Sequence, residues 1–318
     1  MLYSYYPTKK NSEYLVKNTF SSLLESIEYF LEEPEFCNED VKLILNSLIK
    51  YISKNSHFLF PFMLLNHVLV SKYEKENKIE FNFYLRNFIN NIDEIQSHGK
   101  FIKYSSPIFS AEYWKICKSV VTDTFQEEVF LEPPSEKNFD QTCVNIAMAL
   151  DEIEKISQPF FEEISTFVSS YLIIKSNRFI AGSSFPLIGL IGLSEKLSVE
   201  KLIELIVHES AHQYIYHLTV FDGLCEGAGA FKSPLRKDPR PIEGIYHATF
   251  VLSRLIAFYA EAKEKSTLIR GEVINNLLKN YQMKFEDGYQ TIMKHGLLSE
   301  LGRKLIVSCN IGVKNNLM

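Results

Sequence analysis

The sequence lacks the features that mark export, membrane insertion or a cysteine-built site. No basic segment followed by an apolar one opens the chain, so a signal peptide is not expected. No apolar run approaches the roughly 18 residues that cross a bilayer. The five cysteines are odd in number and form no CxxC pair, which excludes a disulfide framework and a cysteine-rich metal cluster. They are Cys37, Cys117, Cys143, Cys225 and Cys309.

The chain also lacks a surplus of positive charge. Its formal net charge is −5, and no basic run is interleaved with aromatic residues, which argues against a nucleic-acid-binding surface. With 46% apolar and 23% charged residues, the composition is that of an ordinary globular protein. The sequence therefore predicts a cytoplasmic protein that binds neither nucleic acid nor a membrane, with one large or two ordinary domains in its 318 residues.

Most of the chain has the apolar periodicity of helices, as in Leu15, Phe20, Leu23, Ile27 and Phe30. The helices predicted in the first part of the chain cover residues 13–33, 41–53, 57–77 and 79–95. Those predicted in the second part cover residues 143–157, 160–174, 199–218, 242–262 and 273–295. Residues 299–309 predict a short helix or turn with a terminal strand.

Strand signals are few. Residues 178–194 are rich in Ile, Phe and Gly and are broken by Pro186, which predicts two short strands joined by a turn. The polar stretch 127–140 predicts a connection between two lobes. We therefore expect a mostly α-helical α+β fold, with a helical N-terminal lobe over residues 1–130 and a second lobe with a small sheet over residues 141–318.

The segment Ile203–Leu218 carries the strongest chemical signal. It contains His208, Glu209 and His212 in an HExxH pattern, and Ser198 is a suitable N-cap for the helix. Residues four apart share one helix face, so the two imidazoles can bind the same metal ion. The alternative is that both are core histidines, but a chance HExxH is expected in only about one chain in a hundred. The pattern predicts a zincin-like metal site in the second lobe.

A catalytic zinc or iron needs at least a third protein ligand. His217 follows His212 by five residues and therefore lies off the metal face of the helix. The realistic candidates are His247 and Glu243, which share a face of the next helix. The sequence leaves the choice between them open.

Arg254, on the same helix face as these candidates, has two interpretations. Arg254 lies seven residues, or about 10 Å of helix, beyond His247. It is either the partner in a buried salt bridge or a ligand for the distal carboxylate of a metal-chelating co-substrate, since a guanidinium grips a carboxylate at two points. The Gly- and Pro-rich loop 219–241 before this helix is long, and a loop of this length within a compact domain is more often functional than idle.

From about Thr166 to its end, the chain resembles the HExxH-motif peptide-modification family, which is associated with ribosomally made peptides. The first 130 residues show no such resemblance. It is carried by the segments AGSSFPLIGLIGLS, LIVHESAHQYIYHL, SPLRKDPRPIEGIYHATFVLSR and LLSELGRKLI.

The resemblance implies an Fe(II)- and 2-oxoglutarate-dependent dioxygenase that hydroxylates the β-carbon of a residue in a peptide. His208, His212 and His247 would then be the iron ligands. Glu209 would be a weak ligand, or would orient the metal ligands without binding the iron, rather than act as a general base. Three protein ligands are the limit, because the co-substrate and O2 need the remaining positions of an octahedral iron.

The resemblance also implies that Arg254 binds the C5 carboxylate of 2-oxoglutarate. Arg240, and more weakly Arg236, would contact the co-substrate or the peptide from the loop. The N-terminal region is a candidate for recognising a leader peptide or a carrier protein.

Two other functions fit the motif. In a zinc metallopeptidase, Glu209 would be the general base, with the two motif histidines and Glu243 as ligands. Tyr246 or Arg254 would then stabilise the oxyanion. The other alternative is a non-catalytic module in which any bound metal is structural.

Overall fold

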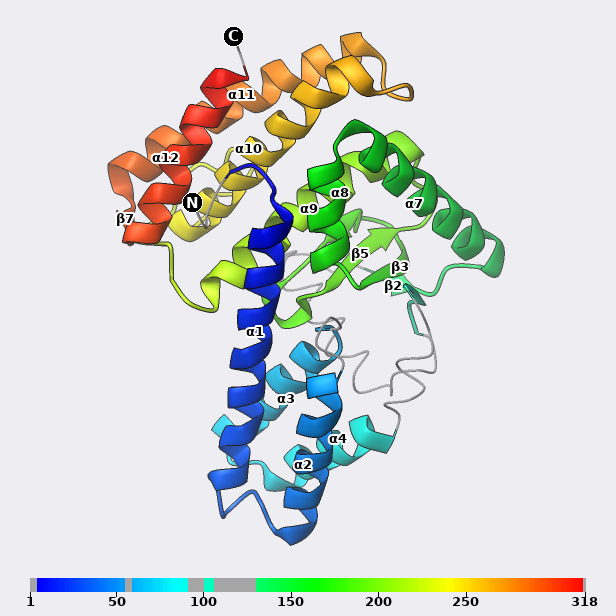
Figure 1. The fold of residues 1–318 in the computed structure, drawn as a ribbon, viewed down its shortest axis with the longest axis vertical. Coiled ribbons are helices and arrows are strands. Elements are labelled where there is room, and N and C mark those ends of the chain that lie inside the picture. The colour runs from blue at the N-terminus through cyan, green and yellow to red at the C-terminus, as the bar shows by residue number, and fades with distance from the viewer. Residues whose placement is uncertain (1–4, 55–58, 91–99, 106–129, 317–318) are drawn as a thin grey trace. The chain divides into compact units, whose positions relative to one another are not determined.

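The computed structural model describes residues 5–54, 59–90, 100–105 and 130–316. It is mostly helical with a small mixed sheet, so the predicted α+β class is confirmed (Figure 1). The chain forms two compact units. The helical unit consists of Met1–Leu15, Val144–Phe167 and Leu197–Met318. The sheet unit consists of Val16–Cys143 and Val168–Lys196.

The helices of the sheet unit follow the predicted apolar periodicity. They are α1 (Lys9–Tyr29, which starts in the helical unit), η1 (Phe30–Glu32), α2 (Glu39–Lys54), α3 (Phe62–Glu74), α4 (Lys78–Asn90) and the 3₁₀ turn η2 (Phe185–Leu187). The Val41 amide donates to Asn38 Oδ1 at 3.0 Å, as expected for the cap of α2. The end of the predicted fourth helix, residues 91–95, lies outside the described residues.

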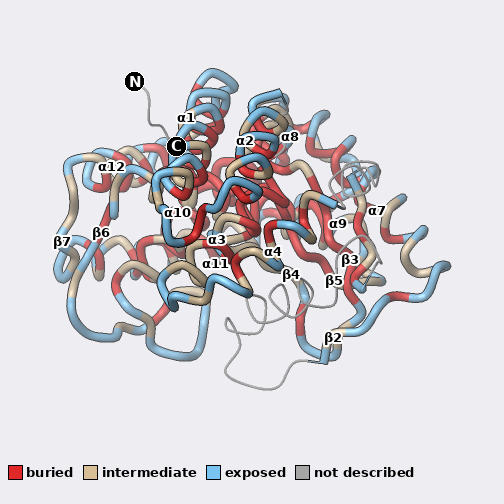
Figure 2. Tube along the Cα trace, turned by 90° about the horizontal axis from the view of Figure 1, so that it is seen from below, coloured by how far each residue is buried: buried red, intermediate tan, exposed pale blue. Residues whose placement is uncertain are grey.

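The sheet is built around β3 (Ser170–Ser176). This strand runs parallel to β1 (Phe101–Lys103) on one side and to β5 (Leu190–Ser194) on the other. Two short strands add antiparallel pairs, β4 (Ala181–Gly182) on β5 and β2 (Leu131–Glu132) on the end of β3. The first five residues of β3 and the first four of β5 are buried, so these strands form the core of the unit (Figure 2).

Two expectations for this region were wrong. The helix predicted over 160–174 ends at Phe167, where α8 (Gln158–Phe167) stops and β3 follows. A fully buried strand has a continuous apolar run, which periodicity cannot separate from a buried helix. The sheet also does not belong to the second lobe alone, because β1 from the first 130 residues pairs with β3. The unit division therefore differs from the predicted division between residues 130 and 141.

The helical unit is organised around α10. Its elements are α7 (Glu136–Ile156, which starts in the sheet unit), α8, α9 (Val199–Thr219), β6 (Cys225–Glu226), α10 (Ile242–Lys265), α11 (Gly271–His295), β7 (Leu297–Leu298) and α12 (Glu300–Asn315). α10 packs against α9, α11 and α12 (Figure 1). The terminal strand predicted near residue 309 is wrong: the chain continues as helix, which Ser299 caps by accepting from the Gly302 amide at 2.9 Å.

The described cysteines, Cys37, Cys143, Cys225 and Cys309, are not in disulfides. Across the described part of the chain, no helix is long and apolar enough to cross a membrane.

α10 and α11 approach closely at Gly288. A Cβ on this residue would lie 2.1 Å from Thr249 Oγ1 on α10, far inside van der Waals contact. Only glycine fits this position, and it lies one turn after Lys284 on α11. The close approach therefore fixes how the middle of α11 sits against α10.

We expect Gly288→Ala to lower the free energy of unfolding by about 1–3 kcal/mol, because the added methyl overpacks the helix interface. Urea unfolding monitored by circular dichroism measures this. Gly271→Ala is the matched control on α11, since nothing lies within 4 Å of a Cβ there. Adding Thr249→Ala should recover part of the loss; equal stabilities of the two glycine variants would contradict the packing argument.

Candidate metal site

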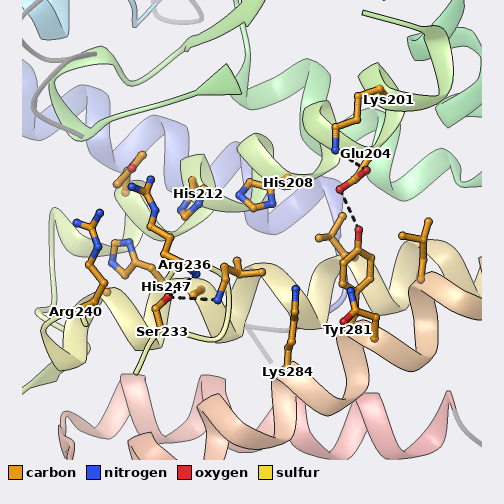
Figure 3. Close-up of a pocket in the computed structure, with 17 residues that line it drawn as sticks. Lys201, Glu204, His208, His212, Ser233, Arg236, Arg240, His247, Tyr281 and Lys284 are labelled. Carbon is orange, nitrogen blue, oxygen red and sulfur yellow. Dashed lines mark hydrogen bonds and ion pairs between the residues drawn. The ribbon is translucent and has the colours of Figure 1, made fainter. Parts of the chain in front are cut away.

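A cavity of about 670 Å³ lies between α9, α10, α11 and the loop before α10 (Figure 3). It belongs entirely to the helical unit. The residues that line it are Lys201, Glu204, His208, His212, Tyr216, Ser233, Leu235, Arg236, Arg240, Gly244, His247, Ala248, Leu255, Leu277, Asn280, Tyr281 and Lys284.

One stripe of α9 forms a wall of this cavity. It runs through Lys201, Glu204, His208, His212 and Tyr216, at the three- and four-residue spacing of a helix face. The start of α9 is fixed by its predicted cap, because Ser198 Oγ accepts from the Lys201 amide at 3.3 Å. The cavity thus receives both histidines of the HExxH pattern.

Three imidazoles gather in the cavity. The ring centroids of His208 and His212 are 5.1 Å apart, and those of His212 and His247 are 6.3 Å apart. Burial lowers the pKa of His208 and of His247 to about 4, and that of His212 well below its usual value. All three rings are therefore neutral near pH 7, which is the form that binds a metal.

These distances allow a test of metal binding. Two imidazoles on one ion, each with its nitrogen about 2.1 Å away, have centroids about 4.5–5.5 Å apart. The pair His208 and His212 meets this condition, whereas His247 is about 1 Å too far from His212. Accordingly, no group of three metal-ligating side chains is already closed around one point in the described residues. The buried Nδ1 of His212 has no hydrogen-bond partner there either. The residues fit a metal held by the first pair, and His247 lines the same cavity.

Of the two candidates for the third ligand, His247 lines the cavity and Glu243 does not. The charge of Glu243 acts instead at Cys225, where burial and then this carboxylate raise the pKa of the thiol to about 11. His217, which lies off the metal face, is fully buried and stacks on Phe167 at 4.7 Å.

The motif glutamate, Glu209, is buried and is not part of the cavity lining. Among the described residues, the lining carboxylate is Glu204, one turn before His208. Its Oε1 accepts from the Tyr281 hydroxyl at 3.0 Å, and its Oε2 accepts from Lys201 Nζ at 2.9 Å.

The loop before α10 places Arg236 and Arg240 in the cavity (Figure 3). The loop is held by paired backbone hydrogen bonds between Phe231 and Arg240, at 2.7 and 2.8 Å. Ser233 Oγ accepts from the Arg236 amide at 3.1 Å. Burial, then the neighbouring Arg240, lowers the pKa of Arg236, and the charges of Glu209 and Asp238 oppose that shift.

Arg254 does not reach the cavity, which corrects its predicted role as a co-substrate ligand. It is fully buried, and its Nη2 donates to Glu163 Oε2 on α8 at 3.1 Å. The guanidinium also lies over the rings of Tyr214 and Phe250, at 4.7 and 5.1 Å. Burial raises the pKa of Glu163, and Arg254 opposes that rise. The buried salt bridge is the alternative that the sequence left open.

Tyr246, proposed for the peptidase oxyanion, is also outside the lining. Its hydroxyl donates to the Gly302 carbonyl at 2.8 Å.

Several residues that line the cavity belong to no sequence motif and were not predicted. Lys201 and Glu204 precede His208 by seven and four residues, so their place on the same face could have been read from helical spacing. Asn280, Tyr281 and Lys284 come from α11, and nothing in the sequence indicates which helix faces the histidines.

A comparison with protein-family models gives no match, and a comparison with curated proteins gives none either. The assignment of a function therefore rests on the residues of the cavity.

We expect His208→Ala and His212→Ala each to abolish binding of one Fe(II) or Zn(II) in equilibrium dialysis with metal analysis. His295→Ala, an exposed histidine outside the lining, is the control. Because burial lowers the pKa of His208 and His247 to about 4, protons compete only as the pH falls toward that value. Binding should therefore survive to about pH 5, although ordinary histidines, with a pKa of about 6.5, would be protonated there. Loss of the metal already at about pH 6.5 would contradict neutral, buried ligands.

Breaking the buried ion pair should be costly. We expect Arg254→Ala to lower the free energy of unfolding by about 3–5 kcal/mol, because the Glu163 carboxylate is left buried alone. The double variant Arg254→Met with Glu163→Leu should be far less affected. Lys304→Ala, which removes an exposed pair with Glu300, should cost less than about 1 kcal/mol. A mild Arg254→Ala phenotype in urea unfolding would show that the pair is not a structural requirement.

Proposed function

We propose that this protein is an Fe(II)- and 2-oxoglutarate-dependent enzyme that hydroxylates the β-carbon of a residue in a peptide. The observation that supports it best is the composition of the cavity: three neutral imidazoles face two arginines, and the motif glutamate is outside the lining. The likeness to the HExxH peptide-modification family and a zincin-like arrangement of the C-terminal lobe are part of the same proposal.

In this proposal His208, His212 and His247 hold the iron, and the remaining positions stay open. Bound iron and 2-oxoglutarate supply the oxidation, in which one atom of O2 enters a C–H bond as hydroxyl and the other leaves in succinate, formed together with CO2. The chain's own groups orient the reactants and limit access of water.

Arg240, with Arg236 beside it, takes the role first expected of Arg254. The Nε of Arg240 is buried, and its guanidinium has no hydrogen-bond partner among the described residues. A carboxylate of 2-oxoglutarate provides such a partner, in the two-point geometry that guanidinium favours. The histidines would then hold the iron at the other end of the co-substrate.

The zinc metallopeptidase remains the second candidate. Tyr216 lines the cavity, with its ring 6.1 Å from that of His212 and 5.9 Å from that of His247, a suitable place for stabilising an oxyanion. Against it, the general base would have to be Glu209, which does not line the cavity, or Glu204, whose two oxygens already accept hydrogen bonds.

The two functions separate in one assay. We expect protein purified without oxygen to form succinate when Fe(II), 2-oxoglutarate and O2 are added. His208→Ala should abolish succinate, and Arg240→Gln should raise the KM for 2-oxoglutarate at least tenfold, the equivalent of about 1.4 kcal/mol. Lys237→Gln, on the same loop but outside the lining, is the charge-matched control.

Absence of succinate together with zinc-dependent peptide cleavage that Glu209→Gln abolishes would replace the dioxygenase with the peptidase. Full activity in both His208→Ala and His212→Ala would remove the metal site from the mechanism.

A further inference from the structure

The cavity lining carries more positive charge than the proposed reaction uses. Among the described residues, four cations, Lys201, Arg236, Arg240 and Lys284, line the cavity with one lining carboxylate, that of Glu204. The charges of Glu209 and Asp238 act on Arg236 from outside the lining. Since the iron carries two positive charges and 2-oxoglutarate two negative ones, binding both leaves this excess unchanged. A second anion is therefore electrostatically favoured in the cavity.

Glu204 does not neutralise Lys284. Each of its oxygens has a partner already, Tyr281 on one and Lys201 on the other. This pairing cancels the charge of Lys201. It leaves Lys284 as a half-buried ammonium that forms no hydrogen bond or ion pair within the described chain.

Lys284 is placed to meet a ligand. It projects from α11 into the cavity, across from His208 on α9 (Figure 3). Asn280 lines the cavity one turn earlier on the same helix face, so an amide donor lies beside the ammonium. The close approach of α10 and α11 at Gly288 holds this turn in place.

We infer that Lys284, with Asn280, forms a subsite for a carboxylate of the substrate, so that the preferred peptide is acidic at or next to the residue that enters the cavity. The inference rests on the proposed function only in taking the occupant to be a peptide. The carboxylate comes from an Asp or Glu side chain or from the peptide C-terminus.

The alternative occupant of this subsite is 2-oxoglutarate itself. The arginines favour the other arrangement, because Figure 3 shows Arg236 and Arg240 at one end of the group and the Lys201, Glu204 and Tyr281 cluster at the other, with Lys284 between them. A five-carbon dicarboxylate bound at the arginine end leaves Lys284 for the substrate.

Equilibrium binding of short labelled peptides to the full-length protein tests the subsite without catalysis. The probes are acetyl-Ala-Gly-Asp-Gly-Ala-amide, its Asn counterpart, and the Asn peptide with a free C-terminal carboxylate. We expect one of the two acidic peptides to bind at least tenfold more tightly than the neutral one, and which of them does so identifies the source of the carboxylate.

Lys284→Gln should remove this preference. Lys279→Gln, an exposed lysine of the same helix outside the lining, should retain it and controls for net charge. Calorimetry of 2-oxoglutarate with Mn(II), a redox-inactive substitute for iron, should give the same affinity for Lys284→Gln and for the natural sequence.

No preference for an acidic peptide, or a preference that survives Lys284→Gln, overturns the inference. So does a Lys284→Gln protein that loses affinity for 2-oxoglutarate but not for the acidic peptide. The double variant His208→Ala with His212→Ala should keep the peptide preference. Failure to form succinate would therefore reject the dioxygenase and leave this subsite standing.

Discussion

The helical period of α9 is the constraint on which the rest of the site depends. Its residues at positions 201, 204, 208, 212 and 216 face the cavity, while Glu209, Gln213 and His217 on other faces are buried in the unit. A helix with two such faces needs a partner for each. α10 and α11 complete the cavity, and α8 packs on the buried side, where Phe167 stacks on His217. The HExxH pattern is thus divided: its histidines line the cavity, whereas its glutamate is buried outside the lining and acts by charge on Arg236.

Local signals made much of this predictable. Ser198 caps α9 as expected, and His208 and His212 share the cavity face. Each of these depends on spacing within one element or on its immediate neighbour. Arg236 and Arg240, which also line the cavity, were expected from the family resemblance alone. The sequence left His247 and Glu243 open as the third ligand; of the two, His247 lines the cavity and Glu243 does not.

The predictions that failed involve partners far apart in the sequence. Helical spacing put Arg254 on the same face of α10 as His247, but it could not identify the partner of Arg254. That partner is Glu163, which lies 91 residues earlier in the chain. The first part of β3 was predicted as helix because this central strand, paired with β1 and β5 at its edges, is buried on both faces, which removes the alternation that identifies a strand. Lys284 was missed because its role depends on which helix packs across from α9.

The hydrogen bond from Tyr281 to Glu204 joins α11 to α9 beside the histidines. This bond links α9 and α11 directly, in addition to the packing of each helix against α10. An anion bound next to Glu204 would compete with its carboxylate for the Tyr281 hydroxyl and the Lys201 ammonium. If the proposed subsite at Lys284 holds, a short acidic side chain would be preferred to a long one, because a long one would bring its carboxylate close to that of Glu204.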